Sequence, residues 1–423
     1  MTYQDSLNYL SDLGREYMDM RLGLGPVSDL LGRLDHPQDQ YPSVLIAGTN
    51  GKGSIAAMTA SILSEAGLKT GLYTSPHLVD IRERITINGE MISPEAFAGC
   101  IEEVKGRKTE NVTYFEFLTV VAFLYFAQKK IDVAVLEVGL GGRLDATNCV
   151  NPAVSVVSNI AFDHTEYLGK TLAEIAREKG GIIKTGGVCV TAARQKKVIE
   201  VLATICKEKE AALYRIGKEI KTTVHRDGTF SYRGIDRYYP CLTHRLPGRH
   251  QVENTAGAIA AIELMRRKGF PIGDDALMRG IENVRWPGRM EVIRREPTVI
   301  LDVAHNPAGV TVLCRALKSD FSYRRLIVVF GVFRDKDYLT MVRKLAFLAD
   351  EFIFTSPGTE RALPPEALLD IARPFKRLAQ AVQKPIDALR KALDAASVDD
   401  LICAAGSLYM IGEIKRDWAL PDP

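Results

Sequence analysis

The stretch Gly48–Ser54, GTNGKGS, places glycines and a lysine between an apolar run and a helical pattern. Glycines let backbone N–H groups approach phosphate oxygens closely, a helix N-terminus favours an anion, and Lys52 adds a positive charge. The stretch departs from the usual phosphate-loop pattern because Ile46 replaces its first glycine and Gly53 follows the lysine. A glycine-rich turn without a ligand is the alternative, but the strand–loop–helix context favours nucleotide binding.

A second candidate lies where Glu137 ends another apolar run, just before the glycine-rich stretch Gly139–Gly142. The C-terminal ends of parallel strands face the ligand crevice of such a sheet. Carboxylate oxygens are suitable ligands for Mg²⁺, which keeps several of its waters. Glu137 is therefore expected to hold Mg²⁺ against nucleotide phosphates, and the alternative is a strand-end glutamate that points to solvent.

Asp163 and His164 follow the next predicted strand on the same expected ligand side, where a histidine is either structural or functional. Lys179 lies in the last turn of a predicted helix that begins with a Thr171/Glu174 capping box and has Gly180 at its C′ position. A lysine in that turn complements the helix dipole without any ligand. Position alone favours this helix-dipole role for Lys179 and leaves the role of His164 open.

Two stretches in the second half also end predicted strands. In Leu301–Pro307, LDVAHNP, Asp302 is placed to bind the two hydroxyls of a ribose, and His305 belongs to a polar turn beside it. An Asn-Pro turn with a helix cap is the alternative. Ser407 follows the last predicted strand and precedes a helix, a geometry that suits either an anion or an ordinary cap.

The elements that position these residues alternate between strands and helices, which predicts parallel βαβ units and a doubly wound, mostly parallel sheet. The predicted strands are Ser43–Ala47, Gly71–Tyr73, Val133–Val138, Ala153–Ser158, Val188–Thr191, Thr298–Val303, Leu326–Phe330, Glu351–Thr355 and Leu401–Ala404. The predicted helices include Ser54–Ala66, Thr113–Gln128 and Gln251–Lys268. Glu116 fits a capping box with Thr113, which leaves a substrate role for it open.

Two departures from this alternation divide the chain. The stretch Thr222–Tyr239 alternates polar and apolar residues around Asp227-Gly228, which predicts a small antiparallel insertion. The stretch Arg285–Arg289, RWPGR, should interrupt regular structure. We therefore predict an N-terminal nucleotide-binding domain over residues 1–287 and a smaller Rossmann-like α/β domain over residues 291–423.

The composition excludes several classes of protein. Hydrophobic residues make up 46% and charged residues 25% of the 423 residues, proportions that exclude a disordered or fibrous chain. The net charge of +3 argues against a nucleic-acid partner. Seven cysteines without a Cys-x-x-Cys pair favour a reducing compartment. The N-terminus lacks the pattern of a signal peptide, and the longest apolar run is shorter than the ~20 residues that cross a bilayer, so we expect a cytoplasmic protein without a membrane partner.

Taken together, the motifs resemble the folylpolyglutamate synthase/dihydrofolate synthase family, within the Mur-type ATP-dependent amino-acid ligases. They occur in the order of that family and over nearly the whole chain. The motifs are GTNGKGS at 48–54, TSPHL at 74–78, FEFLT at 115–119, EVGLGGRLDATN at 137–148, FDHT at 162–165, EKGGIIK at 178–184, GRHQVEN at 248–254, WPGRME at 286–291 and DVAHNP at 302–307.

The resemblance implies an enzyme that adds L-glutamate to the carboxylate of a pteroate or folate through an acyl phosphate formed from ATP. It implies dihydrofolate synthase and folylpolyglutamate synthase activity in one chain, with a single-activity enzyme as the alternative. A cell-wall precursor ligase of the Mur type is a weaker alternative, because Lys52 leaves no room for its usual additional N-terminal domain. A nucleotide-hydrolysing switch would give no role to Asp302 and His305.

The resemblance also implies a role for individual residues. ATP would be bound by Thr49, Asn50, Gly51, Lys52, Gly53 and Ser54, with Asn254 at the adenine, Arg289 at the phosphates and Asp302 at the ribose. Two Mg²⁺ ions would be held by Ser75, Glu137, His164 and a carbamoylated Lys179. The acceptor would be bound by Arg82 and Asp145, and glutamate by His305 and Ser407. Lys52, His164, Lys179 and His305 would be the catalytic residues, and we expect a monomer.

Overall fold

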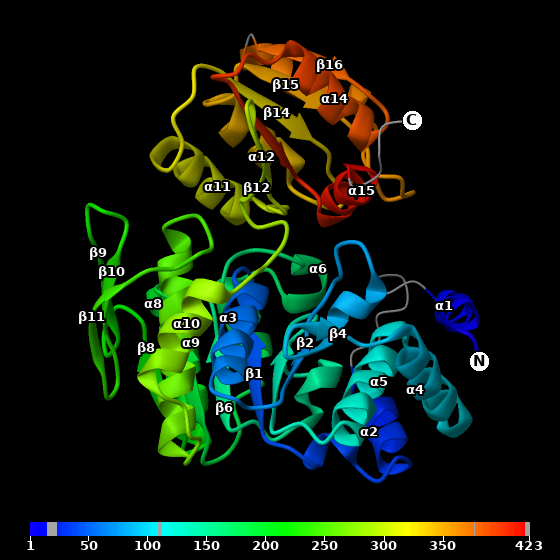
Figure 1. Cartoon of the computed structure of the whole chain (residues 1–423), viewed down its shortest axis with the longest axis vertical. Coiled ribbons are helices and arrows are strands. Elements are labelled where there is room, and N and C mark those ends of the chain that lie inside the picture. Colours follow the sequence, from blue (N-terminus) through cyan, green and yellow to red (C-terminus); the bar gives the residue numbers. More distant parts are fainter. Residues whose placement is uncertain (15–22, 109–111, 376, 419–423) are drawn as a thin grey trace. The chain divides into compact units, whose positions relative to one another are not determined.

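The computed structural model describes residues 1–14, 23–108, 112–375 and 377–418. The chain forms two compact units (Figure 1). The first unit comprises Met1–His77, Ile81–Arg245 and Gln251–Val284. The second unit comprises Leu78–Asp80, Leu246–His250 and Arg285–Pro423, so two short segments that precede Arg285 belong to it.

The first unit is built on an eight-stranded sheet with the order β4-β3-β2-β5-β1-β6-β7-β8. Its strands are β1 (Ser43–Ala47), β2 (Thr70–Tyr73), β3 (Ile85–Ile87), β4 (Glu90–Met91), β5 (Val133–Glu137), β6 (Val154–Val157), β7 (Val188–Thr191) and β8 (Ala212–Arg215). Strands β2, β5, β1, β6, β7 and β8, in that order across the sheet, are parallel. Strands β3 and β4 pair antiparallel at the edge beside β2. The central strands β1 and β5 are buried along their whole length, which explains their continuous apolar runs.

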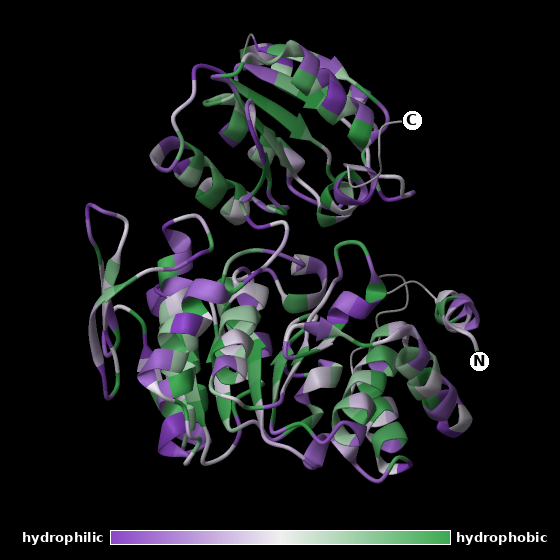
Figure 2. Ribbon diagram, in the orientation of Figure 1, coloured by the Kyte–Doolittle hydropathy of each residue, from purple (hydrophilic) through white to green (hydrophobic). Residues whose placement is uncertain are grey.

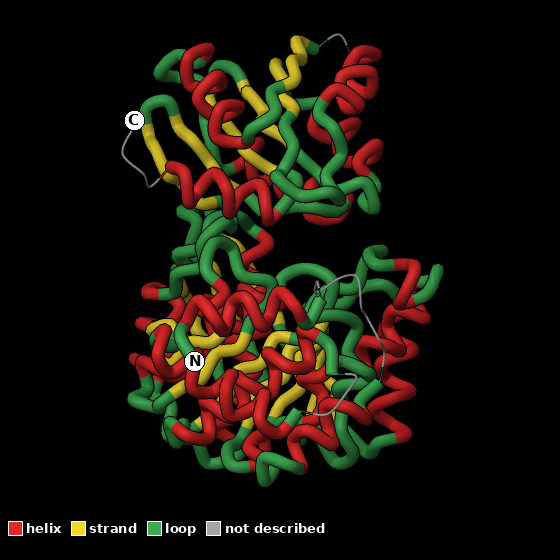
Figure 3. Tube along the Cα trace, turned by 90° about the vertical axis from the view of Figure 1, so that its right-hand side faces the viewer, coloured by secondary structure: helices red, strands yellow, loops and turns green. Residues whose placement is uncertain are grey.

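Helices surround this sheet, as the red and yellow segments of the larger body in Figure 3 show. They are α1 (Tyr3–Asp12), α2 (Gly25–Gly32), α3 (Lys52–Glu65), α4 (Pro94–Arg107), α5 (Tyr114–Gln128), α6 (Thr165–Leu168), α7 (Leu172–Gly180), α8 (Lys196–Glu208), α9 (His250–Arg267) and α10 (Asp274–Asn283), with 3₁₀ turns at Pro37–Asp39, Ile81–Arg84 and Ala146–Cys149. Helices α4, α5, α7 and α8 share one apolar core with β1 and β5. No helix in the described ranges is both long and apolar enough to cross a membrane.

The predicted antiparallel insertion is confirmed as a three-stranded sheet, formed by β9 (Lys221–Val224), β10 (Phe230–Arg233) and β11 (Tyr238–Leu242). Helix α9 anchors it through the buried carboxylate of Glu263. That carboxylate accepts hydrogen bonds from the hydroxyl of Tyr232 at 2.7 Å and from the backbone N–H groups of residues 235, 236 and 237 at 2.8–3.0 Å.

The second unit has a six-stranded sheet with the order β12-β13-β17-β14-β15-β16, parallel except for β12. Its strands are β12 (Glu291–Arg295), β13 (Thr298–Leu301), β14 (Leu326–Phe330), β15 (Glu351–Phe354), β16 (Leu378–Ala381) and β17 (Leu401–Ala405). Its helices are α11 (Pro307–Ser319), α12 (Tyr338–Ala346), α13 (Glu366–Ala372), α14 (Pro385–Ala395) and α15 (Leu408–Trp418), and a 3₁₀ turn covers Arg373–Phe375. Two apolar cores contain its strands, which are among the most hydrophobic segments in Figure 2.

The predicted fold class is confirmed, and most predicted strands differ from the observed ones by one or two residues at an end. The prediction that Gly180 lies beyond its helix is wrong, because α7 includes Gly180 and is capped by Gly181. Gly180 instead allows close packing, since a methyl group there would lie 2.7 Å from the Cδ1 of Ile205 in α8. The antiparallel strands β3, β4 and β12 and the parallel strands β8 and β16 were not among the predicted elements.

Candidate active site

The loop between β1 and α3 requires glycine at two positions. Gly48 has φ +145°, and a methyl group on its Cα would lie 1.7 Å from the Oγ of Ser158. Gly51 is the N-cap of α3 with φ +86°, a left-handed conformation that favours glycine. The loop therefore turns sharply and directs the helix N-terminus, with its free N–H groups, toward the end of the sheet.

The segment that follows β6 holds this loop in place. Ser158 Oγ donates to the carbonyl of Asn50 at 2.8 Å, and the N–H of Asn50 donates to Asn159 Oδ1 at 2.9 Å. Thr49 Oγ1 donates to the carbonyl of Ala161 at 3.1 Å and accepts from its N–H at 3.0 Å. Because these hydrogen bonds fix the loop, it is preorganised before any anion binds.

Two lysines meet at the start of this loop. Lys52 Nζ donates to the carbonyls of Gly48 at 3.2 Å and Thr49 at 3.3 Å, and Lys179 Nζ donates to Gly48 at 2.8 Å. Lys179 is buried. Burial, and then the nearby charge of Lys52, lower the pKa of Lys179 to about 7, although Asp163 and Asp145 oppose this shift. Lys179 thus lies at the phosphate loop rather than only at a helix end.

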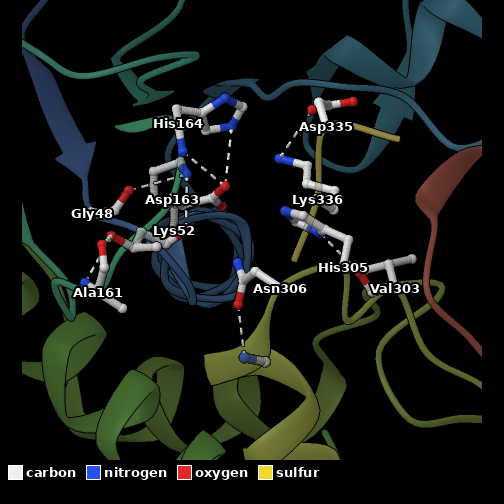
Figure 4. A network of polar contacts seen from close by, with 12 residues as sticks. Gly48, Lys52, Ala161, Asp163, His164, Val303, His305, Asn306, Asp335 and Lys336 are labelled. Atoms are coloured by element: carbon white, nitrogen blue, oxygen red, sulfur yellow. Dashed lines mark hydrogen bonds and ion pairs between the residues drawn. The ribbon is translucent and has the colours of Figure 1, made fainter. Parts of the chain in front are cut away.

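Asp163 and His164 lie close to Lys52, as Figure 4 shows. His164 has a left-handed backbone with φ 49°, and its N–H donates to Asp163 Oδ1 at 3.0 Å. Its imidazole Nε2 is 3.8 Å from the same oxygen, and its side chain is 28% exposed. The imidazole therefore lies near a carboxylate and is partly exposed.

Glu137 is the last residue of β5 and pairs in register with Ile46 of β1. Its carboxylate is buried and accepts a hydrogen bond from the N–H of Ser75 at 3.3 Å. Glu137 thus offers a buried carboxylate beside the backbone of Ser75, and carboxylate and hydroxyl oxygens are ligands of the kind that Mg²⁺ prefers. Within the described ranges, no group of three or more histidine, cysteine, aspartate or glutamate side chains forms a metal-binding cluster.

The first turn of α9 also reaches the phosphate loop. A methyl group at Gly51 would lie only 2.4 Å from Asn254 Oδ1, so the amide of Asn254 lies against the loop. Asn254 Nδ2 donates to Gln251 Oε1 at 2.8 Å. Gln251 lies within the motif GRHQVEN, but its position alone gives no sign of this contact.

The two residues assigned to the acceptor have structural contacts of their own. Asp145 is buried and accepts from the N–H of Leu140 at 2.8 Å and from the N–H and hydroxyl of Thr147 at 3.0 and 2.5 Å. Burial raises the pKa of Asp145 against the effect of these bonds. The guanidinium of Arg82 lies 5.5 Å from the centre of the Tyr3 ring. The roles of Asp145 and Arg82 in acceptor binding remain predictions.

Sequence reasoning did not identify Arg84, which follows in the same 3₁₀ turn as Arg82. Its side chain is among the largest that are fully buried, and its Nε donates to His77 Nδ1 at 2.9 Å. The arrangement ties the turn to the TSPHL motif, and the only available signal was the position of His77 in that motif.

In the second unit, Asp302 directly follows β13. Its carboxylate accepts from the N–H groups of Met290 and Ala304, each at 2.9 Å. Burial raises the pKa of Asp302, whereas the charge of Arg289 opposes that shift. His305 Nδ1 lies 3.0 Å from the carbonyl of Val303 (Figure 4), so its imidazole is held beside Asp302.

Ser407 lies between β17 and α15 in the same unit. Its hydroxyl is buried and has no hydrogen-bond partner among the described residues. The preceding Gly406 has φ +116°, and a methyl group there would lie 2.4 Å from the carbonyl oxygen of Gly331. A buried hydroxyl without a partner costs free energy unless another group pairs with it.

The structure thus brings the predicted residues together in several separate groups. Within the first unit, Lys52, Lys179 and Asn254 meet at Gly48–Ser54, and Glu137 contacts Ser75. Within the second unit, Arg289, Asp302 and His305 form a further group. The first unit thus brings two amines and an amide to the loop and a carboxylate to Ser75, and the second unit brings together a guanidinium, a carboxylate and an imidazole.

Comparison with known families gives two matches. Residues 46–262 match the Mur ligase middle domain, and residues 288–408 match the Mur ligase glutamate ligase domain. A dihydrofolate synthase/folylpolyglutamate synthase from Bacillus subtilis is 35% identical over 98% of this chain and 98% of its own length.

Solved structures show the same similarity. E. coli FolC in complex with DHPP and ADP superposes with a TM-score of 0.92 at 31% identity, over 99% of this chain and 98% of that one. The bifunctional folylpolyglutamate synthase/dihydrofolate synthase from Yersinia pestis, complexed with AMPPNP and Mn, has a TM-score of 0.88 at 30% identity, over 99% and 98% of the two chains.

Proposed function

The chain belongs to the folylpolyglutamate synthase/dihydrofolate synthase group of the Mur ligase family, and on that premise we propose that it joins L-glutamate to both dihydropteroate and reduced folates. It is an ATP-dependent ligase. The observation that carries the proposal is the meeting of Lys52, Lys179 and Asn254 at one preorganised phosphate loop. We assign ATP binding to residues 1–287 and glutamate ligation to residues 291–423.

The proposed reaction has two steps. The γ-phosphoryl group of ATP passes to the acceptor carboxylate, which gives an acyl phosphate and ADP. The amine of L-glutamate then attacks the acyl carbon and expels phosphate, which forms the amide bond. The backbone N–H groups of Gly51–Ser54 and the ammonium of Lys52 hold the phosphates and neutralise the charge that develops on the transferred group.

The remaining residues of the first unit position the reactants. We assign Asn254 to the adenine, and Arg82 and Asp145 to the acceptor. Ser75, Glu137 and His164 are assigned to Mg²⁺, and the oxygen donors of Ser75 and Glu137 fit that ion. When bound, Mg²⁺ supplies positive charge against the phosphate oxygens.

Lys179 is assigned to the metal site as a carbamate. Its lowered pKa supports this assignment, because CO₂ adds only to a neutral amine and the product releases one proton. The carbamate replaces a buried cation with an anion, which cancels the repulsion between Lys179 and Lys52. We propose that two Mg²⁺ ions bind at this site together with the carbamate.

The second unit is assigned to the ribose, the phosphates and the incoming amino acid. Asp302 accepts from the ribose hydroxyls, Arg289 pairs with the phosphates, and His305 and Ser407 contact L-glutamate. The unpartnered hydroxyl of Ser407 supports this last assignment. We further propose that the enzyme is a cytoplasmic monomer; its seven cysteines are all free thiols, which suits a reducing compartment.

The test is a ligation assay with ATP, Mg²⁺ and L-glutamate, run in parallel with dihydropteroate and with tetrahydrofolate. Phosphate release is measured together with the mass of each product. A gain of one glutamate on both acceptors is expected. A gain on one acceptor alone would reduce the proposal to a single activity, and ATP hydrolysis without any gain would contradict it.

A further inference from the structure

The loop that follows β5, residues 139–148, packs directly against the C-terminal turn of α7. A methyl group on Gly142 would lie 3.0 Å from the carbonyl oxygen of Lys179. A methyl group on Gly181 would lie 2.3 Å from the Cβ of Arg143. Only glycine at these two positions allows so close an approach, so the loop touches the helix turn that carries Lys179.

Asn148 closes this contact from inside the fold. It belongs to the 3₁₀ turn Ala146–Cys149, which begins directly after Asp145, and only 5% of it is exposed. Its Nδ2 donates to the carbonyl of Arg143 in the loop at 3.0 Å and to the carbonyl of Gly181, the C-cap of α7, at 3.3 Å. Its backbone N–H donates to the carbonyl of Asp145 at 2.8 Å. One residue thus joins Asp145 to the end of α7.

The orientation of the Asn148 amide is fixed by its partners. Both partners are backbone carbonyls, which only accept hydrogen bonds, so an amide that turned over would direct Oδ1 at two other acceptors. Oδ1 is itself buried and has no partner among the described residues. The side chain therefore acts through Nδ2, with one hydrogen bond that braces the loop and one that crosses to α7.

An ion pair spans the same junction on its exposed side. Arg143 Nε and Nη2 donate to Glu178 Oε1 at 3.1 and 2.9 Å, and these two side chains are 54% and 21% exposed. An exposed ion pair contributes little, whereas a buried carbonyl that loses its donor is costly. The buried bridge of Asn148, rather than the ion pair, should therefore determine how closely the loop follows the helix.

We propose that Asn148 is a positioning residue that holds Asp145 and Lys179 in a fixed relation to each other. This inference rests on the proposed assignments of Asp145 to the acceptor and of Lys179 to a metal-binding carbamate. The acceptor carboxylate receives the phosphoryl group beside the metal, so the acceptor and the carbamate have to be aligned. If the loop and the helix separate, the acceptor is bound less tightly and Lys179 is less shielded from water. One change at position 148 should therefore affect both groups.

Four variants separate this role from a contribution to the fold alone. Asn148→Leu keeps the branched shape of the side chain and removes its donor, and Asn148→Ser is a milder change that retains a hydroxyl donor. Arg143→Met removes only the exposed ion pair. Tyr41→Phe is the matched control, because the buried hydroxyl of Tyr41 also donates to a backbone carbonyl, that of Phe123 at 3.1 Å, away from this junction.

The dissociation constant of dihydropteroate is measured without ATP or Mg²⁺, and the Lys179 carbamate is measured by mass in the same samples, together with the Tm. In Asn148→Leu we expect a dissociation constant that is about tenfold higher, with a lower fraction of carbamate. Asn148→Ser should change both quantities in the same direction but less, and it decides the question if Asn148→Leu does not fold. Arg143→Met should leave both quantities nearly unchanged.

Tyr41→Phe should lower the Tm without changing either quantity. A lower Tm in the Asn148 variants with unchanged acceptor binding and carbamate, or a change in only one of the two quantities, would overturn the inference. A larger effect in Arg143→Met than in Asn148→Leu would also overturn it. An unmodified enzyme that neither binds dihydropteroate nor carries the carbamate would overturn the proposed function together with the inference.

Discussion

The amines of Lys52 and Lys179 donate hydrogen bonds to the same carbonyl oxygen, that of Gly48, at 3.2 and 2.8 Å. Two cations at one oxygen repel each other, and only Lys179 is fully removed from water. Burial and the charge of Lys52 therefore lower the pKa of Lys179 to about 7. At neutral pH a large fraction of this amine carries no proton and can react with CO₂.

Replacing Lys179 by alanine should lower ligation by about 100-fold, because the metal-binding carbamate cannot form. Short carboxylates such as acetate should partly restore the activity, whereas they should have no effect on the unmodified enzyme. The measured quantity is kcat with and without added carboxylate. Because the pKa of Lys179 is about 7, carbamate detected by mass should increase as the pH rises from 6 to 8 at constant dissolved CO₂. Full activity of Lys179→Ala without added carboxylate would mean that Lys179 serves only in helix packing.

Replacing Glu137 by alanine should lower metal-dependent ligation by about 1000-fold, or about 4 kcal/mol, because a charged ligand of the metal is lost. Glu137 is at the end of its strand, so the fold should persist, which a circular dichroism spectrum checks. Glu116→Ala is the matched control: that carboxylate is also buried and accepts from the N–H and hydroxyl of Thr113 as part of a helix cap. Retained Mg²⁺-dependent turnover in Glu137→Ala would remove Glu137 from the metal site.

Gly51→Ala and Gly67→Ala separate backbone strain from an effect on the nucleotide. The two glycines have similar φ values of +86° and +83°, so each substitution should cost about 1–2 kcal/mol of stability. Only the methyl group at position 51 meets a neighbour, since Asn254 Oδ1 would lie 2.4 Å away and Gly67 has open space. ATP affinity, measured by calorimetry, should fall in Gly51→Ala alone. Equal losses of affinity in both variants would contradict the contact with Asn254.

Replacing Ser407 by alanine should raise the KM for L-glutamate by about tenfold without loss of stability. The hydroxyl is buried and unpartnered among the described residues, so its removal takes away an unsatisfied group rather than a hydrogen bond of the fold. Ser6→Ala is the opposite control, because that buried hydroxyl donates to the carbonyl of Thr2 at 2.9 Å. It should lower Tm and leave the KM unchanged. A lower Tm with an unchanged KM for L-glutamate in Ser407→Ala would mean that Ser407 stabilises the fold and does not bind glutamate.

Asp400 should make the stability of the second unit sensitive to acid. Its burial raises the pKa, but the N–H of Ser397 and the guanidiniums of Arg325 and Arg324 outweigh that effect and lower it to about 2, from an ordinary 3.8. The lowered pKa contributes about 2 kcal/mol that is present above pH 4 and is lost as the pH falls toward 2.

Chemical denaturation of Asp400→Asn at several pH values checks this prediction. The variant should be less stable than the unmodified protein at pH 7, and the difference should shrink between pH 4 and pH 2. Asp399→Asn, at the exposed neighbouring position, is the control. A difference that does not change with pH would mean that the carboxylate contributes through packing rather than through charge.

Short-range patterns were sufficient to locate the elements and the strand-end residues. The capping boxes at Thr113 and Thr171, the glycine-rich loop before Lys52 and the position of Glu137 at the end of a buried strand all depend on residues a few positions apart. The hydrogen bonds of a cap or a tight turn are local, so the chain encodes them locally. Strands β3 and β4 at the sheet edge were not predicted, because two or three residues are too few to show an alternation of apolar and polar side chains.

Contacts between distant segments required the folded chain. Position alone assigned Lys179 to a helix dipole, yet its amine reaches Gly48, which is 131 residues earlier. Gln251 carried no signal at all until α9 placed it beside Asn254 and Asn254 beside Gly51. Which side chains meet depends on how helices pack against the sheet, and that packing reflects the burial of the whole apolar core rather than any local pattern.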